Sequence, residues 1–134
     1  MVSILMAHAI ALPEVSNVIR VLAADATRMN SQLLASALER DKRFQVLDPV
    51  SDARGIIAAV AKEKPAVVVI SADLDDEKGK GFEIARELRT LHADARVVML
   101  LDASERNQVV EAFRAGARGV FCRSESLVSL ARCI

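Results

Sequence analysis

Three polar residues directly follow short apolar runs of the sequence: Asp25, Ser71 and Arg123. An aspartate can bind a cation, a serine can act as a nucleophile, and an arginine can pair with a carboxylate. A nucleophilic serine needs a neighbouring base. The two histidines are His8, in the N-terminal tail, and His92, at the end of a predicted helix. Neither lies near Ser71 in this interpretation, so we predict that the chain is not an enzyme.

Short runs rich in β-branched residues alternate along the chain with longer stretches of helical periodicity. Val, Ile and Thr favour strands, and the almost continuous apolar runs are typical of strands buried on both faces. The predicted strands span Val18–Ala24, Phe44–Leu47, Ala66–Ser71, Arg96–Leu101 and Arg118–Cys122, and the predicted helices span Thr27–Arg40, Ser51 or Asp52 to Lys64, Phe82–Leu91, Glu105–Ala115 and Ser124–Ile134, with a polar loop at Asp73–Gly81.

This alternation predicts five βα units with parallel strands joined by right-handed crossovers. Function in such a sheet is sought at the carboxyl ends of the strands. The residues at those ends are Asp25 with Ala26, Ser71, Leu101 and Arg123.

Composition limits the function classes. With 134 residues, 52% of them hydrophobic, the chain can bury the core of one domain. Lys plus Arg and Asp plus Glu number 18 each, and a balanced charge does not favour nucleic-acid binding by this domain itself. The two cysteines, Cys122 and Cys133, are interpreted as buried thiols in a reducing compartment, so we expect a cytoplasmic protein.

The segment Val2–Leu12 is apolar, but no Lys or Arg precedes it and it is too short to span a membrane. We therefore interpret residues 1–17 as a tail outside the core and residues 18–134 as the domain, and we expect no contact with a membrane.

Three stretches resemble the receiver domain of response regulators. Ile19–Asp25 resembles the first strand of that family, which ends in an acidic pair, and Pro65–Ile70 resembles the third strand, which ends in the phosphorylated aspartate. Ala112–Val120 is the most specific match. The resemblance implies a flavodoxin-like (βα)5 three-layer sandwich whose five parallel strands follow the order 2-1-3-4-5.

The family's mechanism needs an acidic pair and an acceptor aspartate to hold Mg²⁺, a lysine to contact the phosphoryl group, and a strand-four hydroxyl to sense it. Asp25 keeps the first acid. Ala26 replaces the second acid, Ser71 stands at the acceptor position, Leu101 at the switch hydroxyl, and Arg123 at the lysine. The resemblance is therefore to a degenerate receiver, or pseudo-receiver.

Each replacement removes part of the chemistry. Ser71 cannot form an acyl phosphate, and Asp25 alone is a poor cation site, so we expect no metal and no cofactor. One Asp facing one Arg predicts an internal ion pair between Asp25 and Arg123 across the ends of the first and last strands.

Two alternatives concern the loop after the third strand. Asp73 lies two residues beyond Ser71 and could serve as a displaced acceptor, with Asp75, Asp76 and Glu77 helping to hold a cation. A solvated acidic loop is the simpler interpretation. The strongest functional alternative is a small-molecule sensor that uses the vacated pocket at the strand ends.

The resulting hypothesis is a signalling module that works through protein contacts without aspartyl phosphorylation. The last predicted helix runs up to Ile134, where the sequence stops, so we expect an output domain beyond this chain, often a DNA-binding helix-turn-helix in this family. Partners would be that output domain or a second copy of the chain. The predicted interface residues are apolar positions of the last two helices: Val109, Val110, Phe113, Leu127, Leu130 and Ala131.

Overall fold

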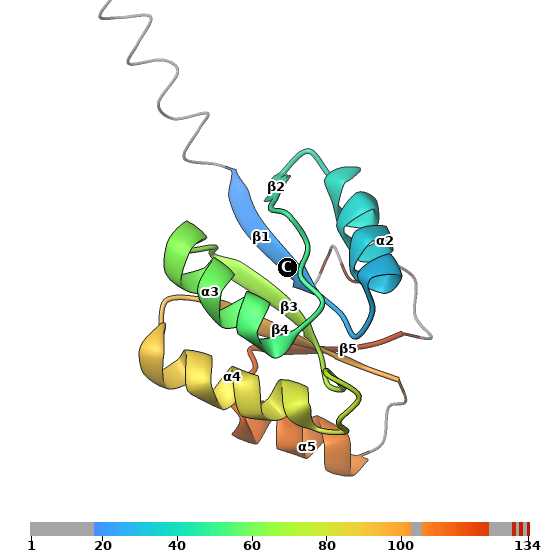
Figure 1. Cartoon of the computed structure of the whole chain (residues 1–134), viewed down its shortest axis with the longest axis vertical. Coiled ribbons are helices and arrows are strands. Elements are labelled where there is room, and N and C mark those ends of the chain that lie inside the picture. The colour runs from blue at the N-terminus through green and yellow to red at the C-terminus, as the bar shows by residue number, and fades with distance from the viewer. Residues whose placement is uncertain (1–17, 103–105, 124–129, 131, 133) are drawn as a thin grey trace, which may run out of the picture.

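Five parallel strands form the centre of the computed structural model, in the order β2-β1-β3-β4-β5 (Figure 1). The structure describes residues 18–102, 106–123, 130, 132 and 134. The strand order and the parallel pairing confirm the predicted flavodoxin-like topology. The strands are β1 (Ile19–Ala24), β2 (Phe44–Val46), β3 (Val67–Ser71), β4 (Arg96–Leu101) and β5 (Gly119–Cys122).

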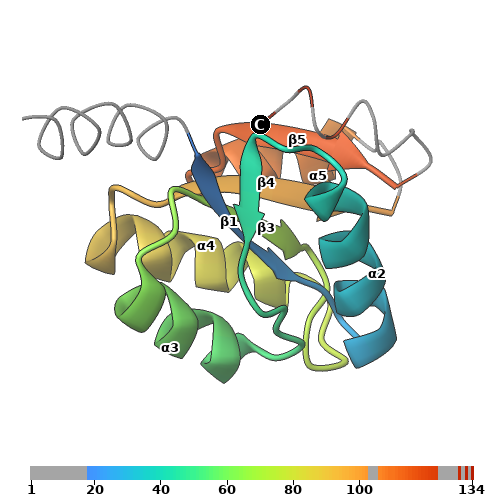
Figure 2. The same ribbon diagram turned by 90° about the horizontal axis from the view of Figure 1, so that it is seen from above.

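Four described helices cover the two faces of the sheet. Figure 2 shows α2 on one side of the sheet and α3 and α4 on the other. The apolar side chains of α5 pack with those of α3 and α4 in one core cluster, whereas α2 contributes to the opposite cluster. The helices are α2 (Arg28–Glu39), α3 (Ala53–Glu63), α4 (Lys80–Leu91) and α5 (Arg106–Arg114).

The alternation along β3 explains why both faces need cover. Val67 and Val69 point into the cluster beneath α2, while Val68 and Ile70 point into the cluster beneath α3, α4 and α5. All five residues of β3 are buried. A strand with apolar side chains on both faces is stable only between two helical layers, which places β3 at the centre of the sheet.

Helix ends follow the local signals in the sequence. The Asp52 side chain accepts a hydrogen bond from the Gly55 amide at 2.6 Å, which makes Asp52, and not Ser51, the N-cap of α3. Lys64 closes that helix in a left-handed conformation, and Pro65 follows. A Schellman motif ends α5, because the Gly116 amide bonds to Phe113 and the Ala117 amide bonds to Ala112.

The start of α4 differs from the prediction. The helix begins at Lys80, two residues before Phe82, because Gly79 takes a left-handed backbone and ends the preceding loop. Gly81 lies against the end of β3, and its amide donates to the carbonyl of Ala72 at 2.9 Å. A Cβ atom at position 81 would lie 2.0 Å from the carbonyl oxygen of Ser71. Only glycine permits this close approach, which brings α4 to the edge of the candidate site.

The predicted interface is only partly exposed, and one member was placed wrongly. Leu130 is fully buried in the core cluster beneath α2, so it cannot meet a partner. Val109 is partly buried and packs on the opposite core cluster. Val110 and Phe113 are exposed, with Phe113 at 51%. Several earlier predictions lie outside the described residues: Leu127, Ala131, the tail at 1–17 and most of the last predicted helix.

Candidate functional site

The guanidinium of Arg123 occupies the carboxyl end of the sheet, where it binds Asp25. Arg123 Nη1 donates to Asp25 Oδ2 at 2.8 Å, and Nη2 donates to Oδ1 at 2.6 Å. The parallel register brings the strand ends together at one edge, so residues that follow β1 and β5 can meet. The predicted Asp25–Arg123 pair is confirmed, as a two-pronged contact that matches the planar fork of the guanidinium to the carboxylate.

Burial of this pair is unequal. The Asp25 side chain is 2% exposed and that of Arg123 is 32% exposed. Asp25 Oδ1 also accepts the Ala26 amide at 2.7 Å, so both of its oxygens are bonded. The carboxylate of Asp25 therefore lies inside the protein, whereas the guanidinium of Arg123 is partly exposed. A charge this deeply buried depends on its partner much more than an exposed one does.

Ser71 joins the same network. Arg123 Nη2 donates to Ser71 Oγ at 3.0 Å, Ser71 Oγ donates to the Asp73 carbonyl at 3.0 Å, and the Asp73 amide donates back to Oγ at 3.3 Å. A hydroxyl offers one donor and two acceptor positions, and all of them are used here. Each of its partners positions the oxygen, and none of them is a base that could remove its proton.

Asp102, at the end of β4, supplies a third group around Arg123 that the sequence analysis missed. Its Oδ1 lies 2.8 Å from Arg123 Nε, and its side chain is 72% exposed. The sequence feature that could have identified Asp102 is its position, because it directly follows Leu101 at the carboxyl end of a predicted strand. One guanidinium thus connects groups that follow or end β1, β3 and β4 with the end of β5.

The environment of Arg123 favours the protonated form of its guanidinium. The hydrogen bonds to Asp25 are the largest influence and raise the pKa of Arg123 above the usual guanidinium value, while burial acts in the opposite direction. A raised pKa in the folded state stabilises the protein below the ordinary pKa of arginine, and that stabilisation is lost only as the pH rises through the raised value. Arg123 therefore stays protonated across the physiological range.

The remaining receiver positions hold groups that bind neither metal nor phosphate through their side chains. Ala26 is exposed and has only a methyl group, and Leu101 is fully buried in the core cluster beneath α3, α4 and α5. Within the described ranges, no group of three or more His, Cys, Asp or Glu residues is arranged to hold a metal ion.

The carboxylate of Asp73 accepts a hydrogen bond from its own loop. Its Oδ1 accepts the Gly79 amide at 3.1 Å, which closes the loop before α4. A cavity of about 200 Å³ lies beside it and is lined by Ser71, Ala72, Asp73, Lys78, Leu100, Asp102 and Gln108. That volume is below the range of about 300–1,000 Å³ usual for small-molecule sites.

The acidic loop is held by the burial of Leu74 and by a hydrogen bond of 3.4 Å from the Ala53 amide to Asp75 Oδ1. Leu74 is fully buried, whereas Asp75, Asp76 and Glu77 are exposed. Asp75 and Asp76 adopt positive φ angles of 53° and 59°, a conformation that aspartate tolerates better than most residues. The three exposed carboxylates fit the solvated-loop interpretation.

Comparison with known proteins identifies the family. Residues 21–132 match the profile of the response regulator receiver domain, so the chain belongs to that family. It is a receiver domain of the two-component response-regulator type, a signalling class. Among curated proteins, no match is found.

Solved structures agree on the fold. A LuxR-family DNA-binding response regulator from Staphylococcus aureus is 15% identical, with a TM-score of 0.77 over 87% of this chain and 95% of that one. A LuxR-family two-component regulator from Aurantimonas is 23% identical, with a TM-score of 0.78 over 86% and 81%. The receiver domain of the putative regulator NarL from Mycobacterium tuberculosis is 17% identical, with a TM-score of 0.78 over 87% and 92%.

Proposed function

We propose that this receiver domain signals through protein contacts and without aspartyl phosphorylation. One observation carries the proposal: the guanidinium of Arg123 fills the phosphorylation end of the sheet and binds Asp25, Ser71 and Asp102 at once. A phosphoryl group would need the space and the cationic partner that Arg123 now gives to carboxylates of the protein itself.

The chemistry argues in the same direction. Phosphoryl transfer to a receiver requires a carboxylate acceptor and a divalent cation that neutralises the phosphoryl oxygens. Ser71 has no carboxylate, and Asp25 is already paired with Arg123. Mg²⁺ prefers several oxygen ligands in octahedral geometry, which a single paired carboxylate does not provide.

The network also connects the site to a surface. Asp102 begins the segment between β4 and α5, and Arg123 Nε holds it. Helix α5 then presents Val110 and Phe113 to solvent. Because these contacts need no phosphoryl group, α5 would offer the same surface at all times to a second copy of the chain or to an output domain outside it. Any contact with DNA would be made by such an output domain.

The decisive experiment is intact-mass measurement after treatment with acetyl phosphate and Mg²⁺. We expect no phosphoryl adduct on the natural chain. The matched control is the triple variant Ala26→Asp, Ser71→Asp, Arg123→Lys, which restores the family's side chains at three positions. A stable adduct on Ser71 or Asp73 of the natural chain would overturn the proposal, and an adduct on the triple variant alone would support it.

The small-molecule alternative has its own measurement. A thermal-shift screen with metabolites would reveal any ligand that binds the folded state, because such a ligand raises the unfolding temperature by mass action. A concentration-dependent rise that Arg123→Lys abolishes would favour a sensor at the strand ends over the proposed function.

A further inference from the structure

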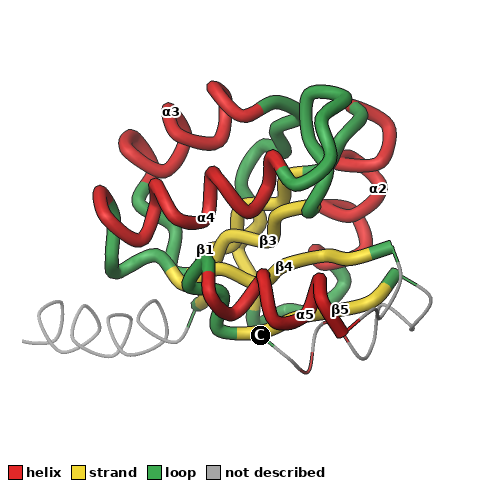
Figure 3. The backbone as a smooth tube through the Cα atoms, turned by 90° about the horizontal axis from the view of Figure 1, so that it is seen from below, coloured by secondary structure: helices red, strands yellow, loops and turns green. Residues whose placement is uncertain are grey.

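We propose that the groove between α4 and α5, at the amino end of the sheet, is a docking site for an acidic, partly apolar segment of a partner protein. The two helices lie side by side in Figures 1 and 3, and an ion pair between Arg86 and Glu111 bridges them. The groove holds about 460 Å³ and is lined by Ala85, Arg89, Ala93, Ala95, Val97, Phe113, Gly116, Ala117 and Arg118. It lies at the opposite end of the sheet from Arg123, because Val97 is near the beginning of β4 and Arg118 precedes β5, whereas Arg123 follows β5.

The groove is basic, and no carboxylate among its described lining residues neutralises its arginines. Arg89 and Arg118 are the only charged residues among the described residues of the lining, and neither forms an ion pair with another described residue. Arg86, one turn before Arg89, shows the contrast, because Glu111 neutralises it. Asp94 does not line the groove itself but the adjoining hollow, which shares Ala93 and Ala95 with it. Two guanidinium groups in one groove attract carboxylates, which they can bind in a bidentate manner.

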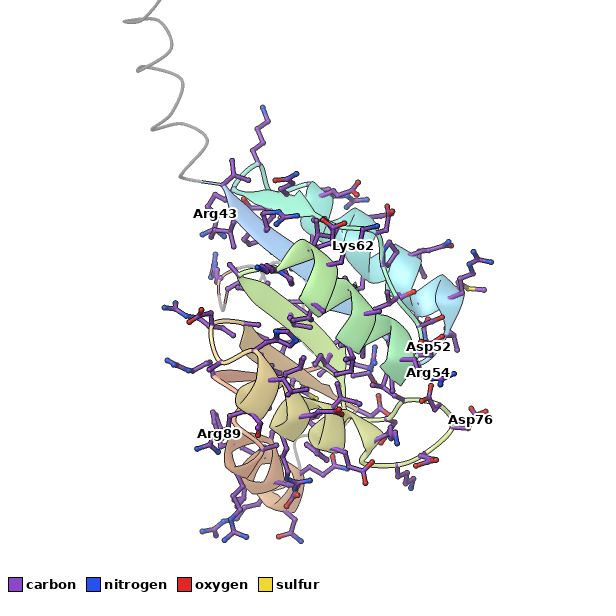
Figure 4. All side chains as sticks on the ribbon, turned by 60° about the vertical axis from the view of Figure 1, so that its left-hand side comes forward. Arg43, Asp52, Arg54, Lys62, Asp76 and Arg89 are labelled. Carbon is purple, nitrogen blue, oxygen red and sulfur yellow. The ribbon has the colours of Figure 1, made fainter. Side chains whose placement is uncertain are left out.

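Small residues shape the floor. Ala85, Val97 and Ala117 are buried there, so an incoming apolar side chain could come close to the backbone. Gly116 has a positive φ of 100°, and a Cβ atom there would lie 2.8 Å from Cδ of Arg89. The absence of a side chain at Gly116 therefore lets the alkyl chain of Arg89 cross this position. Figure 4 labels Arg89 on the side of the molecule where α4 meets α5.

An occupant that matches these features carries apolar side chains for the floor and carboxylates for the two arginines. A peptide segment supplies both along one chain, whereas a basic or purely apolar segment would leave the guanidinium groups unpaired. The groove overlaps the predicted self-association surface at Phe113, which lines the groove, whereas the exposed Val110 does not line it.

The test is an NMR titration of the whole chain with a blocked peptide composed of Leu, Ala and Glu, beside a matched peptide with Lys in place of Glu. We expect the acidic peptide to shift the amide signals of Ala93, Ala95, Gly116 and Arg118. The double variant Arg89→Glu, Arg118→Glu should bind it at least about tenfold more weakly, because two charged hydrogen-bonding groups are lost. The same variant should prefer the Lys peptide.

Arg114→Glu is the matched control, because Arg114 is exposed at the end of α5 but does not line the groove. It should keep the affinity of the natural chain. Equal weakening by Arg114→Glu would show unspecific charge attraction and overturn the proposal. Shifts scattered over the surface, or no shifts up to the solubility limit of the peptide, would do the same. Octanoate bound as tightly as the peptide would also overturn it, in favour of a site for small carboxylates.

Discussion

Arg123 and Asp25 lie 98 positions apart in the sequence, yet two hydrogen bonds of 2.8 and 2.6 Å join their side chains at the end of the sheet. The pair places a protein cation against the acid that a phosphorylated receiver would use to hold a metal. Its arrangement is asymmetric, since Asp25 is inside the protein and Arg123 reaches it from the edge. This asymmetry makes the contribution of the pair to stability measurable.

Replacing Arg123 with Ala should lower the free energy of unfolding by about 3 kcal/mol, because it leaves the carboxylate of Asp25 buried without its partner. Equilibrium unfolding in urea measures the change. Arg123→Lys should retain only part of the stability, since an ammonium group cannot reproduce the bidentate contact and also reach Asp102. The double variant Asp25→Ala, Arg123→Ala should be less destabilised than the sum of the two single variants. Additive losses would contradict a direct coupling.

Asp102 also binds the guanidinium of Arg123, but its side chain is exposed, whereas that of Asp25 is buried. Asp102→Ala should reduce the free energy of unfolding by less than about 1 kcal/mol, because its side chain is 72% exposed and solvent screens the pair. Raising the salt concentration should shrink that small difference further. Asp25→Ala, measured beside it, should cost clearly more at both salt concentrations. If the two aspartate variants were equally destabilised, the inequality in burial would not control the energetics.

Gly81 should tolerate no side chain. Gly81→Ala would place a methyl group 2.0 Å from the Ser71 carbonyl oxygen and 2.8 Å from Cα of Ala72, so backbone must move. We expect a loss of about 2 kcal/mol or more in the free energy of unfolding. Gly119→Ala is the control, because a Cβ atom there would meet nothing closer than 3.8 Å. Its effect in the same urea titration should stay within about 0.5 kcal/mol. A Gly81→Ala protein as stable as Gly119→Ala would show that α4 can retreat freely.

The sheet could be predicted from sequence because its strands carry their own signal. Arg96–Leu101 has the predicted bounds, and β3 differs from its prediction only at Ala66. The start of α4 could not be predicted from periodicity, because Lys80 and Gly81 add nothing to the apolar stripe. A tertiary contact, the approach of Gly81 to the end of β3, decides where that helix begins.

The candidate site, like the fold, could be predicted from the sequence only in part. One acid and one cation at the carboxyl ends of β1 and β5 were enough to predict the Asp25–Arg123 pair. The part played by Asp102 could not be predicted from the five positions of the family's mechanism, because Asp102 is not one of them. Leu130 was misplaced because an apolar residue in a helix can face a partner or its own core, and sequence alone does not say which neighbour covers it.

Self-association is the remaining prediction, and it now rests on Val110 and Phe113. Phe113 is 51% exposed, and an aromatic ring in water is a favourable anchor for an interface centre. Sedimentation velocity over a concentration series should show a dimer that Phe113→Asp abolishes, because a buried unpaired carboxylate opposes association. Met29→Asp is the matched control, since Met29 is an exposed apolar residue on α2, across the sheet, and its change should leave the dimer intact. Leu130→Asp is unsuitable as a probe, because it would place a charge in the core. A protein that remains monomeric at every concentration, or a dimer that survives Phe113→Asp, would remove α5 as the contact surface of this chain.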